Sequence, residues 1–77
     1  MIQVRSFAAA AEAAGVDTER LDAGSADEVR AAMIARHPAL AAVLGRCALL
    51  ADGLRVEGAD PVSTGETLDV LPPFAGG

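Results

Sequence analysis

The chain has 77 residues, of which 11 are acidic and 6 basic, and its formal net charge at pH 7 is −5. A domain of this size buries only about 60% of the surface that its unfolded chain exposes, so it has one thin core and little room for a deep substrate pocket. The negative charge argues against nucleic acid as a partner. The single cysteine excludes an internal disulfide and a cysteine-ligated metal site.

All six basic residues are arginines, so no lysine amine can accept an isopeptide bond. The chain does not open with a basic stretch followed by an apolar run, and we therefore expect no signal peptide. Its apolar runs are far shorter than the roughly 20 residues that span a bilayer. These features predict a cytoplasmic protein that does not contact membranes.

The first predicted element is a β-strand over residues 1–7. Its hydrophobicity alternates, and Ile2 and Val4 mark the face that packs on the core. Phe7 then falls on the opposite face, which is an unusual place for an aromatic side chain. This position favours contact with a partner over a place in the core.

Two short elements follow this strand. Residues 8–14 are nearly all alanine, the best helix former, and Gly15 can supply the left-handed conformation that commonly ends a helix. Residues 18–22 are polar except for Leu21 and predict a short edge strand.

The one long helix is predicted to begin at about Ala26. Ser25 and Glu28 have the spacing of a capping box, in which each side chain binds a backbone amide of the other residue. Pro38 ends the helix because it keeps His37 away from helical angles. The predicted buried stripe consists of Val29, Ala32 and Met33, with Ile34 at its flank.

Two more elements follow the long helix. Pro38 can itself open a second short helix, over residues 39–44, which Gly45 ends. A β-hairpin comes next, with strands over residues 47–51 and 54–56 that are joined by an Asp-Gly turn.

The last predicted elements are a loop and a strand. Residues 58–65 have loop chemistry around an isolated Val62, whereas residues 67–71 alternate again, with Leu68 and Val70 pointing inward. The whole order predicts an α+β fold: a mixed sheet of four or five strands, packed on one face by one main helix and open on the other. We assign residues 1–71 to this domain and residues 72–77 to a flexible C-terminal tail.

The tail reads Pro-Pro-Phe-Ala-Gly-Gly and ends at Gly77. Prolines hold the backbone extended, and six extended residues reach about 20 Å, which is long enough to enter a channel in another protein. Two residues without side chains can pass a narrow slot and present the carboxylate of Gly77 inside it. Because a carboxylate is inert until it is activated, we expect activation by ATP that another protein holds.

The ending Leu-Pro-Pro-Phe-Ala-Gly-Gly resembles that of the ubiquitin-like MoaD/ThiS sulfur-carrier family, and of its branch of molybdopterin synthase small subunits in particular. The opening strand with Phe7, the capped helix that closes at His37-Pro38 and the Asp60-Pro61-Val62 loop match as well. The resemblance therefore covers essentially the whole chain, and the Pro-Pro-x-x-Gly-Gly ending is its specific part.

This resemblance implies a ubiquitin-like β-grasp fold in a protein that is carried as a reagent and has no turnover of its own. An adenylating activating enzyme would use ATP on the carboxylate of Gly77, and a sulfurtransferase would deliver the sulfur of a thiocarboxylate. The large subunit of molybdopterin synthase, in a heterotetramer, would then pass that sulfur to the cyclic pyranopterin precursor during molybdenum cofactor biosynthesis. The chain itself is expected to hold no cofactor and no metal.

The resemblance makes Gly77 the reacting residue. The first and last strands are neighbours in a β-grasp sheet, so their outward side chains extend the predicted docking surface beside the tail. Arg55 falls on the same outer face, where family members can carry an apolar residue, and the extent of the surface stays open there. The predicted partner-binding residues are Gly76, Ala75, Phe74, Pro73, Pro72, Leu71 and Phe7.

Other functions fit the same residues. A thiocarboxylate could feed thiamine, cysteine or thiolated tRNA synthesis, although the Pro-Pro-Phe-Ala stem favours molybdopterin. Gly77 could instead be joined to lysines of target proteins, as in a ubiquitin-like modifier. A plain interaction module with a passive tail is the fourth alternative.

The remaining chemically notable residues are expected to be structural. Cys47 opens an apolar strand and is interpreted as a buried, inert thiol. His37 stands at a helix end, where we expect it to interact with the last carbonyls. The acidic residues Asp17, Glu19 and Asp22 are interpreted as a solvated face.

Overall fold

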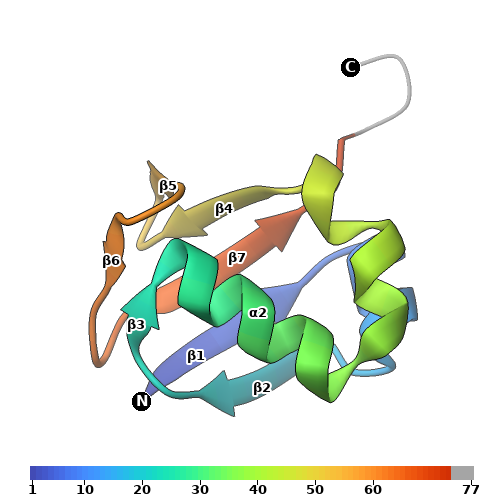
Figure 1. Ribbon diagram of the computed structural model, residues 1–77, viewed down its shortest axis with the longest axis horizontal. Helices are drawn as coiled ribbons and strands as arrows, with labels where there is room; N and C mark the ends of the chain where they lie inside the picture. Colours follow the sequence, from blue (N-terminus) through green and yellow to red (C-terminus); the bar gives the residue numbers. More distant parts are fainter. Residues whose placement is uncertain (74–77) are drawn as a thin grey trace.

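The computed structural model describes residues 1–73, in which five strands form one mixed sheet and one long helix crosses one of its faces (Figure 1). The strand order is β2-β1-β7-β4-β5; β1 and β7 are parallel, and the other neighbours are antiparallel. The strands are β1 (Ile2–Ser6), β2 (Thr18–Leu21), β4 (Ala48–Ala51), β5 (Leu54–Val56) and β7 (Thr67–Leu71). This is the β-grasp arrangement that we expected.

The long helix, α2 (Ala26–Arg36), begins and ends where the capping signals predict. The Ser25 hydroxyl accepts the backbone N–H of Glu28 at 3.1 Å, and the Glu28 carboxylate accepts that of Ser25 at 2.9 Å. At the other end, His37 leaves helical angles immediately before Pro38. Local sequence therefore determines both ends of the helix.

The buried stripe of α2 differs from the prediction. Ala26, Val29 and Met33 are buried, whereas Ala32 is exposed. At 100° per residue, Ala32 lies about a quarter of a turn from the centre of the stripe that these three residues form. The prediction that Ala32 belongs to the buried stripe was wrong, because the small alanine side chain occurs on buried and exposed faces of helices alike.

Two 3₁₀ turns follow α2, where we expected one short helix over residues 39–44. They are η1 (Pro38–Ala42) and η2 (Leu44–Arg46). Gly45 does not end a helix but lies inside η2. The tighter winding, with bonds such as Val43 N–H to Leu40 O at 3.0 Å, turns the fully buried Leu40 side chain into the core.

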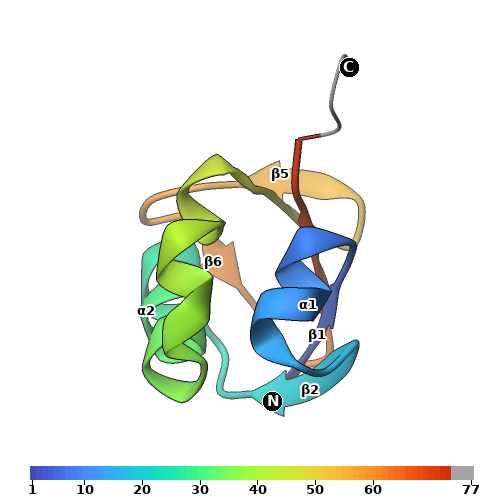
Figure 2. The same cartoon turned by 90° about the vertical axis from the view of Figure 1, so that its right-hand side faces the viewer.

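The short α1 (Ala9–Ala14) and the β4–β5 hairpin agree with the predictions. Gly15 ends α1 with a φ of 75°, in the left-handed region. In the hairpin, Asp52 and Gly53 have φ values of 46° and 86°, and a type I′ turn needs positive values at both of its central residues. Figure 2 shows α1 beside the 3₁₀ segment, which it contacts.

A second, two-stranded sheet was not predicted. Val62, expected to be isolated in a loop, belongs to β6 (Pro61–Val62), which pairs with β3 (Gly24–Ser25). Val62 is 1% exposed and closes the core beside the start of α2. Two residues are too few for a sequence pattern to indicate a strand.

The hydrophobic core fills the space between the sheet and the helical layer. As predicted, Ile2, Val4, Leu68 and Val70 all point into it. Its other large, fully buried side chains are Met33, Leu40, Leu44, Leu49, Val29 and Val62. The opposite face of the sheet is not covered by any helix of residues 1–73 (Figure 1).

Candidate docking face and root of the tail

The chain leaves the sheet at the end of β7, where Leu71 pairs with Ala48 at the start of β4. Beyond β7, Pro72 is buried and Pro73 is exposed. Pro72 thus packs against its own domain and anchors the root of the tail, and its contact with a partner stays a prediction. The predicted site residues Phe74, Ala75, Gly76 and Gly77 lie outside the described residues.

The uncovered face of the sheet, called the open face below, is formed by alternate residues of the five strands. They are Gln3, Arg5, Thr18, Arg20, Ala48, Leu50, Arg55, Thr67, Asp69 and Leu71. Arg55 is among them, opposite Leu50, as its parity predicts.

Phe7 follows the end of β1 and is 38% exposed, so the structure keeps it out of the core as predicted. Its backbone N–H donates to Val70 O at 3.2 Å, which continues the pairing of β1 with β7. Because Ser6 is opposite Val70, Phe7 comes level with Leu71, which is half-buried. The root of the tail and an exposed aromatic ring therefore share one end of the sheet.

An ion pair that the sequence analysis did not identify holds this end of the open face. Arg5 donates to both carboxylate oxygens of Asp69, from Nε at 2.7 Å and from Nη2 at 2.9 Å. These bonds raise the pKa of Arg5 above its ordinary value, and the guanidinium lies 5.8 Å from the ring centroid of Phe7. Arg5 and Asp69 both point outward by strand alternation, and the parallel register of β1 and β7 places them opposite each other. Together, these two facts are enough to predict the ion pair.

Cys47 is 7% exposed, and its thiol donates to Val43 O at 3.4 Å. Burial raises the pKa of the thiol, and the nearby charge of Arg30 opposes that shift without cancelling it. The predicted burial of Cys47 is confirmed, and its lack of reactivity stays a prediction. Arg30 itself, from α2, donates to Leu44 O at 2.6 Å and ties η2 to the helix.

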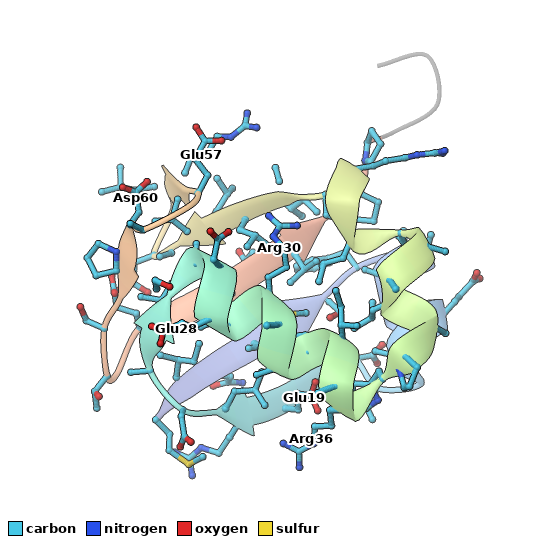
Figure 3. All side chains as sticks on the ribbon, viewed as in Figure 1. Glu19, Glu28, Arg30, Arg36, Glu57 and Asp60 are labelled. Carbon is cyan, nitrogen blue, oxygen red and sulfur yellow. The ribbon has the colours of Figure 1, made fainter. Side chains whose placement is uncertain are left out.

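The expectations for His37 and Glu19 were wrong. His37 Nε2 lies 2.9 Å and 3.0 Å from the carboxylate oxygens of Glu19, rather than on the last carbonyls of the helix. Glu19 points to the helical side of β2, its side chain is 13% exposed, and Arg36 Nε lies 3.5 Å from it (Figure 3). The cluster joins β2 to the end of α2, a contact between elements that no local pattern shows.

Comparison with known proteins gives the family. Residues 4–77 match the sequence profile of the ThiS family. The chain belongs to the ThiS family. One relative of this ThiS-family chain is a molybdopterin synthase sulfur carrier subunit from Chlamydomonas reinhardtii, 32% identical over 81 residues that cover 99% of this chain and 98% of that protein. The resemblance stated from the sequence is confirmed.

Solved structures agree with the fold. SAMP1 from Haloferax volcanii is similar with a TM-score of 0.85 and 28% identity, over 99% of this chain and 98% of that one. A second structure, described as small archaeal modifier protein 1 from Haloferax volcanii, is similar with a TM-score of 0.83 and 26% identity, over 95% of this chain and 97% of that one. A protein complex of subunits 1 and 2 of the molybdopterin-converting factor from Helicobacter pylori 26695 has a TM-score of 0.71 and 25% identity, over 99% and 97% of the chains.

Residues 1–73 lack two kinds of feature, a helix that could cross a membrane and a cluster of metal-ligating side chains. No helix in this range is both long enough and apolar enough to cross a membrane. In the same range, no three His, Cys, Asp or Glu side chains come together as metal ligands would.

Proposed function

We propose that this ThiS-family chain is the sulfur-carrying small subunit of a molybdopterin synthase. It donates sulfur from a Gly77 thiocarboxylate to the cyclic pyranopterin precursor in molybdenum cofactor biosynthesis. The observation that carries the proposal is the root of the tail: β7 ends at Leu71 on the open face, and the buried Pro72 holds the start of the tail against the domain. The full-length relative that is named a sulfur carrier subunit of molybdopterin synthase supports this pathway.

The chemistry at Gly77 needs two activations by other proteins. On an adenylating enzyme, a carboxylate oxygen attacks the α-phosphorus of ATP, and pyrophosphate leaves. The outer sulfur of a persulfide on a sulfurtransferase then attacks the acyl carbon and displaces AMP. A second thiol cleaves the S–S bond of the resulting acyl disulfide, which leaves the thiocarboxylate on Gly77 and a disulfide on the sulfurtransferase. Two glycines suit these steps because a backbone without Cβ atoms can be enclosed on all sides.

The folded domain, in this proposal, is a handle for recognition. Its one thiol is buried with a raised pKa, so the described residues offer no competing sulfur nucleophile. The large subunit binds at the end of the open face that carries Phe7 and Leu71, and the tail continues from there into the active site. The Helicobacter pylori complex of subunits 1 and 2 supports a partner of this kind.

The test combines binding and mass. The chain is coexpressed with the large subunit, the adenylating enzyme and the sulfurtransferase of the same organism, and the intact chain is weighed after purification. We expect a stable complex and the replacement of one terminal oxygen by sulfur. A chain that lacks Gly77 is the control, and it should bind without gaining sulfur. Failure of the intact chain to bind the large subunit would end the molybdopterin assignment.

A ubiquitin-like modifier is the second candidate, and the similarity to small archaeal modifier protein 1 favours it. In that role the activated Gly77 is joined to lysines of target proteins. The same mass measurement on cell extracts separates the two roles, because chymotrypsin cleaves after Phe74 and leaves an Ala-Gly-Gly remnant on the lysine of an isopeptide-linked product. Such products without any thiocarboxylate would favour the modifier.

A further inference from the structure

The strand residues of the open face carry a net charge of the opposite sign to the rest of the chain. Among the strand residues of the open face, the charged side chains are Arg5, Arg20, Arg55 and Asp69. Three positive charges and one negative charge give this set a net charge of +2. The other three arginines share the rest of the chain with ten acids, a net charge of −7. The face beside the root of the tail is therefore positive on a protein whose total charge is negative.

Two of the three arginines on this face have side chains without a partner among the residues that the structure describes. Arg5 is held by Asp69 through two hydrogen bonds. The exposed side chains of Arg20 and Arg55, in contrast, form no hydrogen bond and no ion pair with any residue among 1–73. Of the acids at the margin, Asp52 accepts the backbone N–H of Thr67 at 2.8 Å. The exposed Asp22 and Glu57 follow the ends of β2 and β5.

The two free guanidiniums lie on opposite margins of the sheet. Arg20 is on β2 and Arg55 is on β5, the two edge strands, which Figure 1 shows on opposite sides. Four interstrand spacings and an offset of two residues place their backbones roughly 20 Å apart. The register places Gln3, Thr67, Asp69 and Leu50 between them, whereas Ala48 and Leu71 lie farther along the sheet, toward the root of the tail.

We propose that the open face docks an acidic protein surface, which places carboxylates near Arg20 and Arg55 at the two margins of the sheet. Phosphate backbones are a poor alternative, because the net charge of −7 on the rest of the molecule repels a long polyanion. The proposal rests on the proposed function in naming the occupant, the large subunit that receives the tail. Arg55 then sets partner choice by charge, where a purely apolar surface would be less selective.

The experiment measures association and dissociation rates of the large subunit with the purified chain at low and at high salt. The variants are Arg20→Gln, Arg55→Gln and the double substitution. Arg36→Gln is the matched control for each single substitution, because it makes the same change of net charge on α2, on the other side of the sheet. We expect the double variant to associate about tenfold more slowly at low salt, with a much weaker salt dependence and little change in dissociation. The control should stay within about twofold of wild type.

Each outcome decides the proposal. Equal association rates for the double variant and the control, with wild-type binding intact, would overturn the acidic-partner inference and leave the proposed function standing. No binding of the wild-type chain would refute the proposed function, and the named occupant with it. The third measurement is sedimentation of the chain alone. If the chain forms oligomers and the arginine substitutions convert them to monomers, a second copy occupies the face and the proposed occupant is wrong.

Discussion

Single side chains on the open face differ in what they can do for binding. The ring of Phe7 is partly exposed and lies near the guanidinium of Arg5, which Asp69 holds in place. An aromatic ring that is already oriented loses little freedom when a partner covers it, and such rings are frequent binding hot spots. Phe7 is therefore the described residue on which we expect docking to depend most.

Phe7→Ala should weaken the affinity for the large subunit by about tenfold or more, a typical hot-spot effect. Its melting temperature should change little, because the ring does not fill the core; removing a buried phenylalanine costs about 3–5 kcal/mol. Calorimetric titration and thermal unfolding measure the two effects. Leu54→Ala is the control, since Leu54 is 74% exposed and is not one of the open-face residues. A large loss of stability in Phe7→Ala would place the ring in the core.

Cys47→Ser should preserve sulfur transfer, because the thiol is buried, has a raised pKa and takes no part in the chemistry at Gly77. The native thiol should also react with a disulfide reagent far more slowly than the unfolded chain does. Transfer assays and labelling rates with and without denaturant measure this. Loss of transfer in a folded Cys47→Ser variant would make the thiol part of the mechanism.

The elements show where local signals are sufficient. The capping box, the Asp-Gly turn and Pro38 act within four residues of themselves, and the element boundaries that they predict are those of the structure. The β3–β6 pair and the Glu19–His37 contact join segments that are distant in the chain. Each depends on how α2 is laid across the sheet, so residue patterns along one segment did not reveal them.

The capping box makes part of the stability of α2 dependent on pH. The hydrogen bond from the Ser25 backbone N–H lowers the pKa of Glu28. A lowered pKa means that the carboxylate favours the folded state above its ordinary pKa of 4.5, and that this contribution is lost as the pH falls through the lower folded value.

Glu28→Gln should therefore destabilise the protein at neutral pH, although glutamine can still accept the bond. The difference from wild type should shrink on acidification, because wild type loses its advantage while the variant has none to lose. Urea unfolding from about pH 3 to about pH 7 measures this trend. A difference that stays constant over that range would contradict the assignment.

At the scale of the whole molecule, the proposed function separates a packed domain from a reacting terminus. The described residues form one packed core, and the proposed chemistry takes place beyond them, at Gly77. Stability and reactivity should then respond to different substitutions.

One alanine appended after Gly77 should leave the melting temperature unchanged and should abolish formation of the thiocarboxylate. The reason is that the activated acid would then carry a side chain and stand one residue farther from the domain. Thermal unfolding and intact mass after coexpression with the activating enzyme check both parts. Normal sulfur loading of the extended chain would contradict the proposed role of Gly77.

The amino-acid sequence alone determined the order of the main strands and the long helix, the inward and outward faces of those strands and the ending that pointed to the family. Alternation, capping and turn chemistry act over a few residues, so they can be interpreted without coordinates. Only the tertiary structure decided that Pro72 anchors the tail, that Glu19 meets His37 and that Arg20 and Arg55 flank one face. Those facts depend on strand order and on the packing of α2, which bring distant residues together through the burial of a shared core.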